Sequence, residues 1–214
     1  MNFAIIAQQL VSGMGSSLMI FVLTLLFSMP LGLLVAFGRM SKIKPLQAVI
    51  KVFIAILRGT PLMLQLLVVN FAPYYLFRIS LPRWYRFAAI IIGFSINYAA
   101  YFAEIFRGGL LSVDKGQYEA AKVLGISEMQ TKFKIVMPQM FRISLPAVAN
   151  ETIILLKDTA LVSTIGLADL LDVTKEIVNT STNVSAYAVA AVFYLALSYV
   201  LSILFKKLEG KFSF

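Results

Sequence analysis

The sequence has 214 residues, of which 60% are hydrophobic and only 14% charged, and its mean hydropathy is +0.87. Soluble domains are about 45–50% apolar and about 25% charged, so this apolar excess nearly excludes a water-soluble enzyme. A net charge of +9 would indicate nucleic acid binding in a soluble protein, but here basic residues at a membrane surface explain it better. Cysteine and histidine are both absent, which excludes disulfides, thiol nucleophiles, Ser-His-Asp catalysis and the usual zinc sites.

Five apolar runs follow one another along the chain, each close to or above the roughly 20 residues that a transmembrane helix needs. The second is interrupted by Arg58-Gly59-Thr60-Pro61, and the fourth carries Glu151, Lys157 and Asp158, so these two are the least regular. No basic segment precedes the first run, which is too long for a signal peptide, and we expect it to be retained. We predict an all-α membrane protein with five transmembrane helices in a single domain, residues 1–214. The runs cover residues 10–37, 52–77, 87–106, 143–167 and 186–205.

The basic residues predict the orientation of these five spans. Thirteen of the 19 Lys and Arg residues fall on the side of the C-terminus, in residues 39–51, 107–142 and 206–211. Because basic loops stay in the cytoplasm, the N-terminus should lie outside and the C-terminus inside. Trp84 and Tyr85, between the second and third spans, fit an aromatic belt at the outer interface. Four basic residues fall on the outer side: Arg78, Arg83, Arg86 and Lys175.

Residues 107–142 form the one long polar segment, which this orientation places in the cytoplasm between spans three and four. Its centre, residues 117–125, predicts a short helix ended by a glycine, and a second helical piece follows. Tyr118, Ala121 and Leu124 recur at three-residue spacing and share one helical face. Such a small amphipathic helix fits a groove on a partner protein, lies on lipid or acts as a structural elbow; its small residues favour protein over lipid.

The same segment contains a recognisable motif. Glu119-Ala120-Ala121, then Gly125, then residues 135–138 resemble in sequence and spacing the EAA loop of membrane subunits of bacterial ABC importers, with Met137 where that family usually has Leu. Further segments, in the same order, resemble the polar amino-acid branch of these permeases, and the resemblance covers about residues 10–208. These segments are residues 58–62, 99–109, 150–151 and 156–161.

The resemblance implies a permease subunit of an ATP-driven importer in the bacterial cytoplasmic membrane. Its EAA helix would dock in a cleft of a separate ABC ATPase subunit, which binds ATP and Mg; this chain has no P-loop, no cofactor and no metal site of its own. A second permease subunit, giving a homodimer or a dimer with a similar chain, and an extracytoplasmic solute-binding protein complete the implied assembly. The coupling residues would be Glu119, Ala120, Ala121, Leu124 and Gly125.

Ionisable groups inside spans are costly and therefore mark candidate substrate contacts. Two carboxylate-bearing faces, one with Glu104 and one with Glu151 and Asp158, would attract a cationic side chain, which favours basic amino acids. Donors for the substrate carboxylate would come from an arginine or from backbone N–H groups at the interruption of the second span. The predicted substrate-binding residues are Arg58, Asn97, Glu104, Glu151 and Asp158.

Each candidate also has a purely structural interpretation. Glu104 could pair with Arg107 at the cytoplasmic interface, and Lys157 and Asp158 could pair with charges on a neighbouring span. Arg58 could be a contact between subunits, and Asn150 with Glu151 could hold two helices together. Two other functions remain open at this point: an ion-coupled secondary amino-acid transporter with Glu104 or Asp158 as proton carrier, and an integral-membrane enzyme.

Overall fold

The structure, a computed structural model, describes residues 3–212, and this part of the chain is helical, with short connections and no strand. The predicted all-α class is therefore confirmed. The short segments η1 and η2 are a π-helix and a 3-10 helix. In chain order the elements are α1 (Phe3–Arg39), α2 (Lys44–Gly59), α3 (Leu62–Phe77), α4 (Arg83–Ser112), α5 (Lys115–Val123), α6 (Glu128–Gln130), η1 (Thr131–Val136), α7 (Met137–Asp158), η2 (Thr159–Ile165), α8 (Leu170–Ser181) and α9 (Ser185–Phe212).

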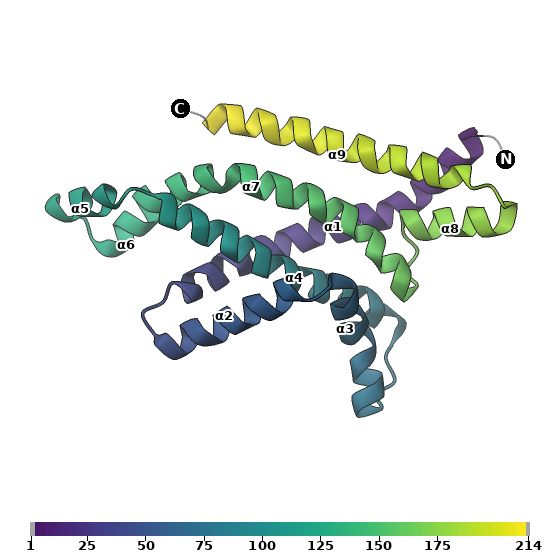
Figure 1. Cartoon of the computed structure of the whole chain (residues 1–214), viewed down its shortest axis with the longest axis horizontal. Helices are drawn as coiled ribbons and strands as arrows, with labels where there is room; N and C mark the ends of the chain where they lie inside the picture. The colour runs from purple at the N-terminus through teal and green to yellow at the C-terminus, as the bar shows by residue number, and fades with distance from the viewer. Residues whose placement is uncertain (1–2, 213–214) are drawn as a thin grey trace.

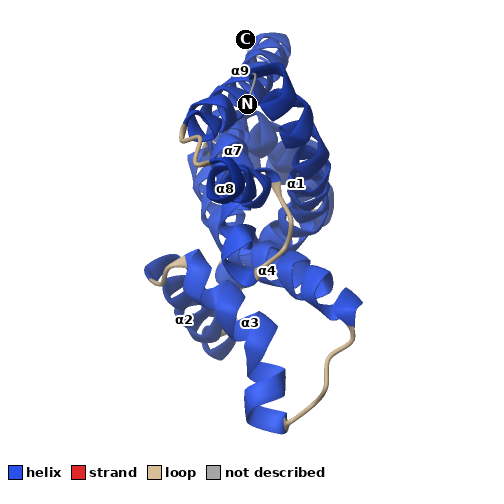
Figure 2. Ribbon diagram, turned by 90° about the vertical axis from the view of Figure 1, so that its right-hand side faces the viewer, coloured by secondary structure: helices blue, strands red, loops and turns tan. Residues whose placement is uncertain are grey.

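Helix α4 is the centre of the bundle. It packs against α1, α2, α3 and α7, while α9 covers α7 on the side of the molecule away from α2 and α3 (Figures 1 and 2). Its aromatic residues recur at four-residue spacing, and Phe94, Tyr98, Phe102 and Phe106 are all buried. A Cβ atom at Gly32 of α1 would lie only 2.7 Å from the Cβ of Phe102, so this glycine allows the two backbones to approach closely.

The apolar surface is distributed as expected for helices in lipid. In the most apolar 18-residue stretch of α4, 72% of the residues are buried within the protein, whereas in the corresponding stretches of α1 and α9 only 28% and 11% are buried. Large apolar side chains therefore face outward along α1 and α9, where a soluble protein of this size would expose few of them in one patch.

Length and composition confirm only part of the predicted span count. Among the described residues three helices, α1, α4 and α9, are long and apolar enough to cross a membrane, and the pair α2 and α3 would make a fourth. That pair is bent by 106° between Gly59 and Leu62, so the interruption seen in the second apolar run is a sharp change of direction. Helix α7 is not among these helices because polar and charged side chains lower its mean hydropathy.

Residues 107–142 are partly helical, because α4 continues to Ser112 and α7 begins at Met137. Helices α5 and α6 lie at the end of the bundle where α1 joins α2 and where α9 ends, and α1 begins at the opposite end (Figure 1).

A second, smaller core holds α8 against the beginnings of α1 and α9. Ile6, Leu10, Leu170 and Ile177 are among its buried members. Asp169 begins α8: its side chain accepts a hydrogen bond of 2.8 Å from the Asp172 N–H, and its carboxyl group is completely buried. Its other oxygen, Oδ2, has no hydrogen-bond partner among the described residues.

Asp169 predicts a specific pH dependence of stability. Burial raises its pKa from the ordinary 3.8 to about 6, against smaller opposing effects of backbone hydrogen bonds and Lys175. The folded protein then binds this proton more tightly than the unfolded chain, so its free energy of unfolding falls as the pH rises from about 4 to about 6. Asp169→Asn keeps the helix cap, and its free energy of unfolding should not fall over this pH range. Its thermal unfolding midpoint should exceed that of the unmodified protein above pH 6 and match it near pH 4.

Glu176→Gln is the control for this measurement, because it removes an exposed carboxylate from the same helix. At every pH, the thermal unfolding midpoint of Glu176→Gln should lie close to that of the unmodified protein. An Asp169→Asn variant that is destabilised equally at every pH would contradict the assignment.

Candidate functional site

The sharp bend between α2 and α3 is held by two amide side chains. The Gln65 Nε2 donates to the Leu57 carbonyl at 2.9 Å and contacts both oxygens of Thr60. Asn97 on α4 donates to the Gln65 Oε1 at 2.9 Å and to the same Leu57 carbonyl at 3.2 Å. These bonds satisfy carbonyls that lose their helical partners where α2 ends. Asn97 is buried, and its amide nitrogen makes both of these hydrogen bonds to the bend.

Arg58 and Asp158 contact two neighbouring tyrosines of α4, beside this bend. Arg58 occupies the last turn of α2, and its guanidinium carbon is 5.1 Å from the centre of the Tyr101 ring on α4. The Tyr98 hydroxyl, one residue after Asn97, donates to the Asp158 Oδ2 at 2.7 Å. Glu151, two turns before Asp158 on α7, interacts electrostatically with both Asp158 and Arg58. The structure therefore brings together two carboxylates, one guanidinium and two tyrosines from α2, α4 and α7.

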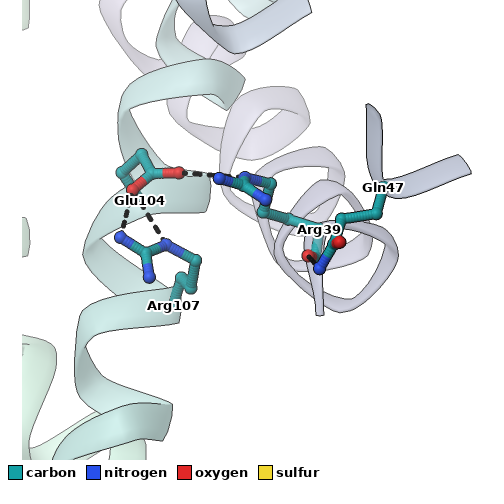
Figure 3. Close-up of polar contacts among 4 residues, drawn as sticks. All are labelled: Arg39, Gln47, Glu104 and Arg107. Carbon is teal, nitrogen blue, oxygen red and sulfur yellow. Dashed lines mark hydrogen bonds and ion pairs between the residues drawn. The ribbon is translucent and has the colours of Figure 1, made fainter. Parts of the chain in front are cut away.

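Glu104 lies apart from this cluster, in an ion-pair network with two arginines (Figure 3). Its Oε2 accepts hydrogen bonds from the Arg107 Nε at 2.9 Å and Nη2 at 2.7 Å. Its Oε1 lies 3.9 Å from the Arg39 Nε at the end of α1, and the Arg39 carbonyl accepts from Gln47 of α2 at 3.2 Å. The structural alternative for Glu104, pairing with Arg107, is thus observed, and the network ties α1, α2 and α4 together.

Loss of the Glu104 carboxylate should therefore affect stability. The side chains of Glu104, Arg39 and Arg107 are 19%, 22% and 33% exposed, so solvent and salt screen the network in part. Glu104→Gln should lower the free energy of unfolding by about 1 kcal/mol at low salt and by less at high salt. Thermal unfolding of the detergent-solubilised protein at two salt concentrations measures this, with Glu176→Gln as the control. A Glu104→Gln variant as stable as the unmodified protein at low salt would contradict a stabilising network.

Among the described residues, neither Lys157 nor Asp158 is in an ion pair with a neighbouring span. Asp158 is bonded to the Tyr98 hydroxyl, and Lys157 is exposed at the end of α7. Within residues 3–212, no group of three or more Asp, Glu, His or Cys side chains is arranged to hold a metal ion.

The predicted short helix in the central polar segment is present as α5, and its ends are capped. The Asp114 Oδ1 accepts from the Gly116 N–H at 2.6 Å at the beginning. At the end, the Ile126 N–H donates to the Ala121 carbonyl at 2.9 Å and the Gly125 N–H donates to the Lys122 carbonyl at 3.1 Å. This is a Schellman motif, and Gly125 has the positive φ of 71° that such a turn requires.

Of the three residues that the three-residue spacing grouped on one face of α5, Tyr118 and Leu124 are exposed but Ala121 is not. Ala121 is only 2% exposed, because it packs α5 onto the rest of the protein, so it is not on the outer surface. Val123 is 87% and Leu124 75% exposed, and Glu119 and Ala120 lie on the same side of the helix. Exposed apolar side chains at the end of a short helix are typical of a surface that docks on another protein.

The family comparison identifies this architecture. Residues 28–214 match the model of a family described as the binding-protein-dependent transport system inner membrane component. The chain belongs to this family. It is therefore a membrane permease, and the sequence resemblance to ABC importer subunits is confirmed.

Two curated relatives are similar to this permease over most of its length. The L-cystine transport system permease protein TcyB of Bacillus subtilis is 38% identical over 192 residues, which are 89% of this chain and 80% of TcyB. The histidine/lysine/arginine/ornithine transport system permease protein HisM of Escherichia coli is 36% identical over 208 residues, which are 94% of this chain and 87% of HisM.

Solved structures show the same fold. A chain in the crystal structure of an amino acid ABC transporter with histidines has 32% identity and a TM-score of 0.88, and the match covers 99% of both chains. A chain of the MetNI methionine ABC transporter in an inward-facing conformation has 18% identity and a TM-score of 0.80. The permease thus belongs with the membrane subunits of amino-acid ABC importers, and the comparisons give no support to an ion-coupled transporter.

Four residues of the site were not among the sequence candidates. Gln65, Tyr98 and Tyr101 are the partners of Asn97, Asp158 and Arg58, and Val123 is the most exposed apolar residue of α5. Gln65 could have been noticed as a polar residue within an apolar run. The position of Tyr98 directly after Asn97 carries no comparable signal, because tyrosine is common in membrane helices.

Proposed function

We propose that this permease carries basic amino acids into the bacterial cytoplasm, driven by a separate ABC ATPase subunit. It would act as a dimer with a second copy or a similar chain, and a solute-binding protein would deliver substrate from outside. The observation that carries the proposal is the cluster of Glu151, Asp158 and Arg58 beside the α2–α3 bend, together with the exposed apolar face of α5.

The proposed topology has five crossings, made by α1, the bent pair α2 and α3, α4, α7 and α9. Its support is that α1 begins and α9 ends at opposite ends of the bundle, as an odd number of crossings requires (Figure 1). The ends of the bundle also differ in charge, because α5, α6 and the turn between α1 and α2 share the end that is rich in lysine. The N-terminus would be outside.

Cysteine labelling tests this topology directly, because the natural chain has no cysteine. Ser80→Cys, in the exposed connection between α3 and α4, should react in intact cells with a membrane-impermeant maleimide. Ser112→Cys, exposed at the end of α4, should react only after the membrane is permeabilised. The opposite pattern would reverse the orientation, and labelling of both positions in intact cells would exclude an odd number of crossings between them.

The proposed substrate site matches both ends of a basic amino acid. Glu151 and Asp158 place two carboxylates beside the single guanidinium of Arg58, while Lys157 is exposed at the end of α7, so a cationic side chain would complete the balance. Helix α3 begins at Leu62 without a side-chain cap, and its first N–H groups are suited to bind the substrate carboxylate. Glu104 and Asn97 already have partners within the protein, so we assign them to the supporting structure.

In the proposed mechanism α5 transmits the conformational change of the ATPase. Glu119, Ala120, Val123 and Leu124 would dock in the ATPase, while Ala121 and the Gly125 turn would hold α5 rigidly on η1. Closure of the ATPase dimer on ATP would then move the bundle as a rigid body.

Substrate-stimulated ATP hydrolysis by the purified complex tests the function. The permease, co-expressed with its ATPase, should hydrolyse ATP faster when the binding protein and arginine or lysine are added. Hydrolysis that does not respond to any amino acid in the presence of the binding protein would contradict the proposal.

A further inference from the structure

A cleft of about 1100 Å³ lies at the α5 end of the bundle. Its walls come from the end of α1 and the following turn, from the last residues of α4, and from α5, α6 and η1. Phe37, Met40, Leu110 and Tyr118 form an apolar part of the wall. The cleft is separate from the cluster around Asp158, because none of its lining residues belongs to that cluster.

Three lysines, Lys42, Lys122 and Lys132, line this cleft against a single acidic residue, Glu128. In the part of the chain that the structure describes, none of these lysines is in an ion pair. The Lys132 Nζ is instead 3.7 Å from the centre of the Phe37 ring, a contact that holds the ammonium group inside the cleft. The site therefore has an excess of positive charge and is suited to an anion.

The apolar part of the wall continues onto a surface that would face lipid. Met40 is 40%, Ile43 61% and Leu46 41% exposed at the turn from α1 to α2. A free inorganic anion would leave these side chains uncovered, whereas the acyl chains of a phospholipid would cover them.

The cleft is on a different side of α5 from the proposed docking face. Tyr118 and Lys122, one turn apart, point to the cleft, whereas Glu119, Ala120, Val123 and Leu124 lie around the opposite side of the helix. An ATPase seated on the exposed face would therefore leave the lysines open toward the membrane.

We propose that this cleft binds the phosphate of an anionic phospholipid, with its acyl chains along Met40, Ile43 and Leu46. Basic pockets between helices at the cytoplasmic interface are suited to such headgroups. The bound lipid would bridge the α1–α2 turn and α5, and so would hold the coupling helix in place. The position of the cleft at the inner interface rests on the proposed topology.

Lipid retention by the full complex tests the proposal. The permease with its ATPase is reconstituted in nanodiscs of phosphatidylcholine mixed with phosphatidylglycerol, and native mass spectrometry counts the phosphatidylglycerol that remains bound after release. The double variant Lys42→Gln with Lys132→Gln should reduce this retention about tenfold, since each of the two lysines contributes a similar share of the attraction to an anionic headgroup. Lys206→Gln with Lys207→Gln, the same charge change at the exposed end of α9, should leave it unchanged.

Two further variants keep the test decisive. Lys42→Arg with Lys132→Arg should retain the lipid, and Lys42→Gln alone, at an exposed position, should lower retention without affecting folding.

Equal loss in both glutamine pairs, or no loss in either, would overturn the proposal. Displacement of the lipid by inorganic phosphate would indicate a free-anion site instead. Unchanged retention with loss of the bound ATPase would assign the cleft to the ATPase interface. ATP hydrolysis stimulated by amino acid in the unmodified complex is a separate readout for the proposed function.

Discussion

Replacing Gly125 with valine is expected to uncouple ATP hydrolysis from substrate while leaving the permease in the membrane. Gly125 has a φ of 71°, where a residue with a Cβ atom is strained by about 1–2 kcal/mol, and a β-branched residue more. Release of that strain would break the Schellman motif that joins α5 to α6 and would change the direction of α5. Stimulation of ATP hydrolysis by the binding protein and amino acid should fall about tenfold or more in the purified complex.

Gly125→Asn is the matched control, because asparagine tolerates a positive φ better than other residues with a side chain. An added Cβ at this position meets no atom within 4 Å, so the two substitutions differ in backbone strain and not in crowding within the chain. Asparagine should preserve most of the stimulation. Full stimulation in the valine variant would contradict the role of this turn in coupling.

Asp158→Asn should lower the uptake of basic amino acids by at least about tenfold at limiting substrate, since removing one partner of a desolvated charge pair costs several kcal/mol. Asparagine has the same shape, and its amide oxygen can still accept the hydrogen bond from Tyr98. The loss should therefore come from the missing charge. Glu151→Gln should act in the same direction, and the double variant should lose the preference for cationic substrates. Competition by unlabelled amino acids against labelled arginine uptake measures that preference.

Glu104→Gln is the matched control variant for this comparison. It also removes a charge from the bundle, but from the network with Arg39 and Arg107 (Figure 3). Its order of preference among amino acids should equal that of the unmodified permease, even if its stability is lower. If Glu104→Gln alters the preference among amino acids and Asp158→Asn does not, the substrate site would instead lie near Glu104, toward the inner end of α4.

Much of this architecture could be predicted from local sequence properties. Long apolar runs predicted α1, α4 and α9, and the interruption at residues 58–61 marked the point where α2 ends. The cap of α5 was also predictable, because a glycine after an alanine-rich helix is a strong local signal. The intramembrane charges pointed to α7, although hydropathy alone does not identify that helix as a span.

The remaining features depend on contacts between segments distant in sequence. The 106° bend between α2 and α3 is supported by Asn97 from α4, which no local pattern near residue 60 could show. Helical spacing placed Ala121 with Tyr118 and Leu124 on one face, but the packing of α5 on η1 buries Ala121 and leaves Val123 exposed. Glu104 was grouped with the substrate residues because its spacing fits Asn97. Its close partner Arg107 was the structural alternative that the sequence offered, but its second partner, Arg39, comes from another helix 65 residues earlier in the chain.

Uptake of labelled arginine into proteoliposomes tests whether ATP drives import of basic amino acids through this permease. The vesicles hold the permease with its ATPase, and the binding protein is added outside. We predict uptake that requires ATP in the lumen and the binding protein, and that lysine reduces by competition while glutamate does not. Uptake driven by a proton or sodium gradient without ATP would contradict ATP-driven import, and equal competition by glutamate and lysine would contradict a preference for basic amino acids.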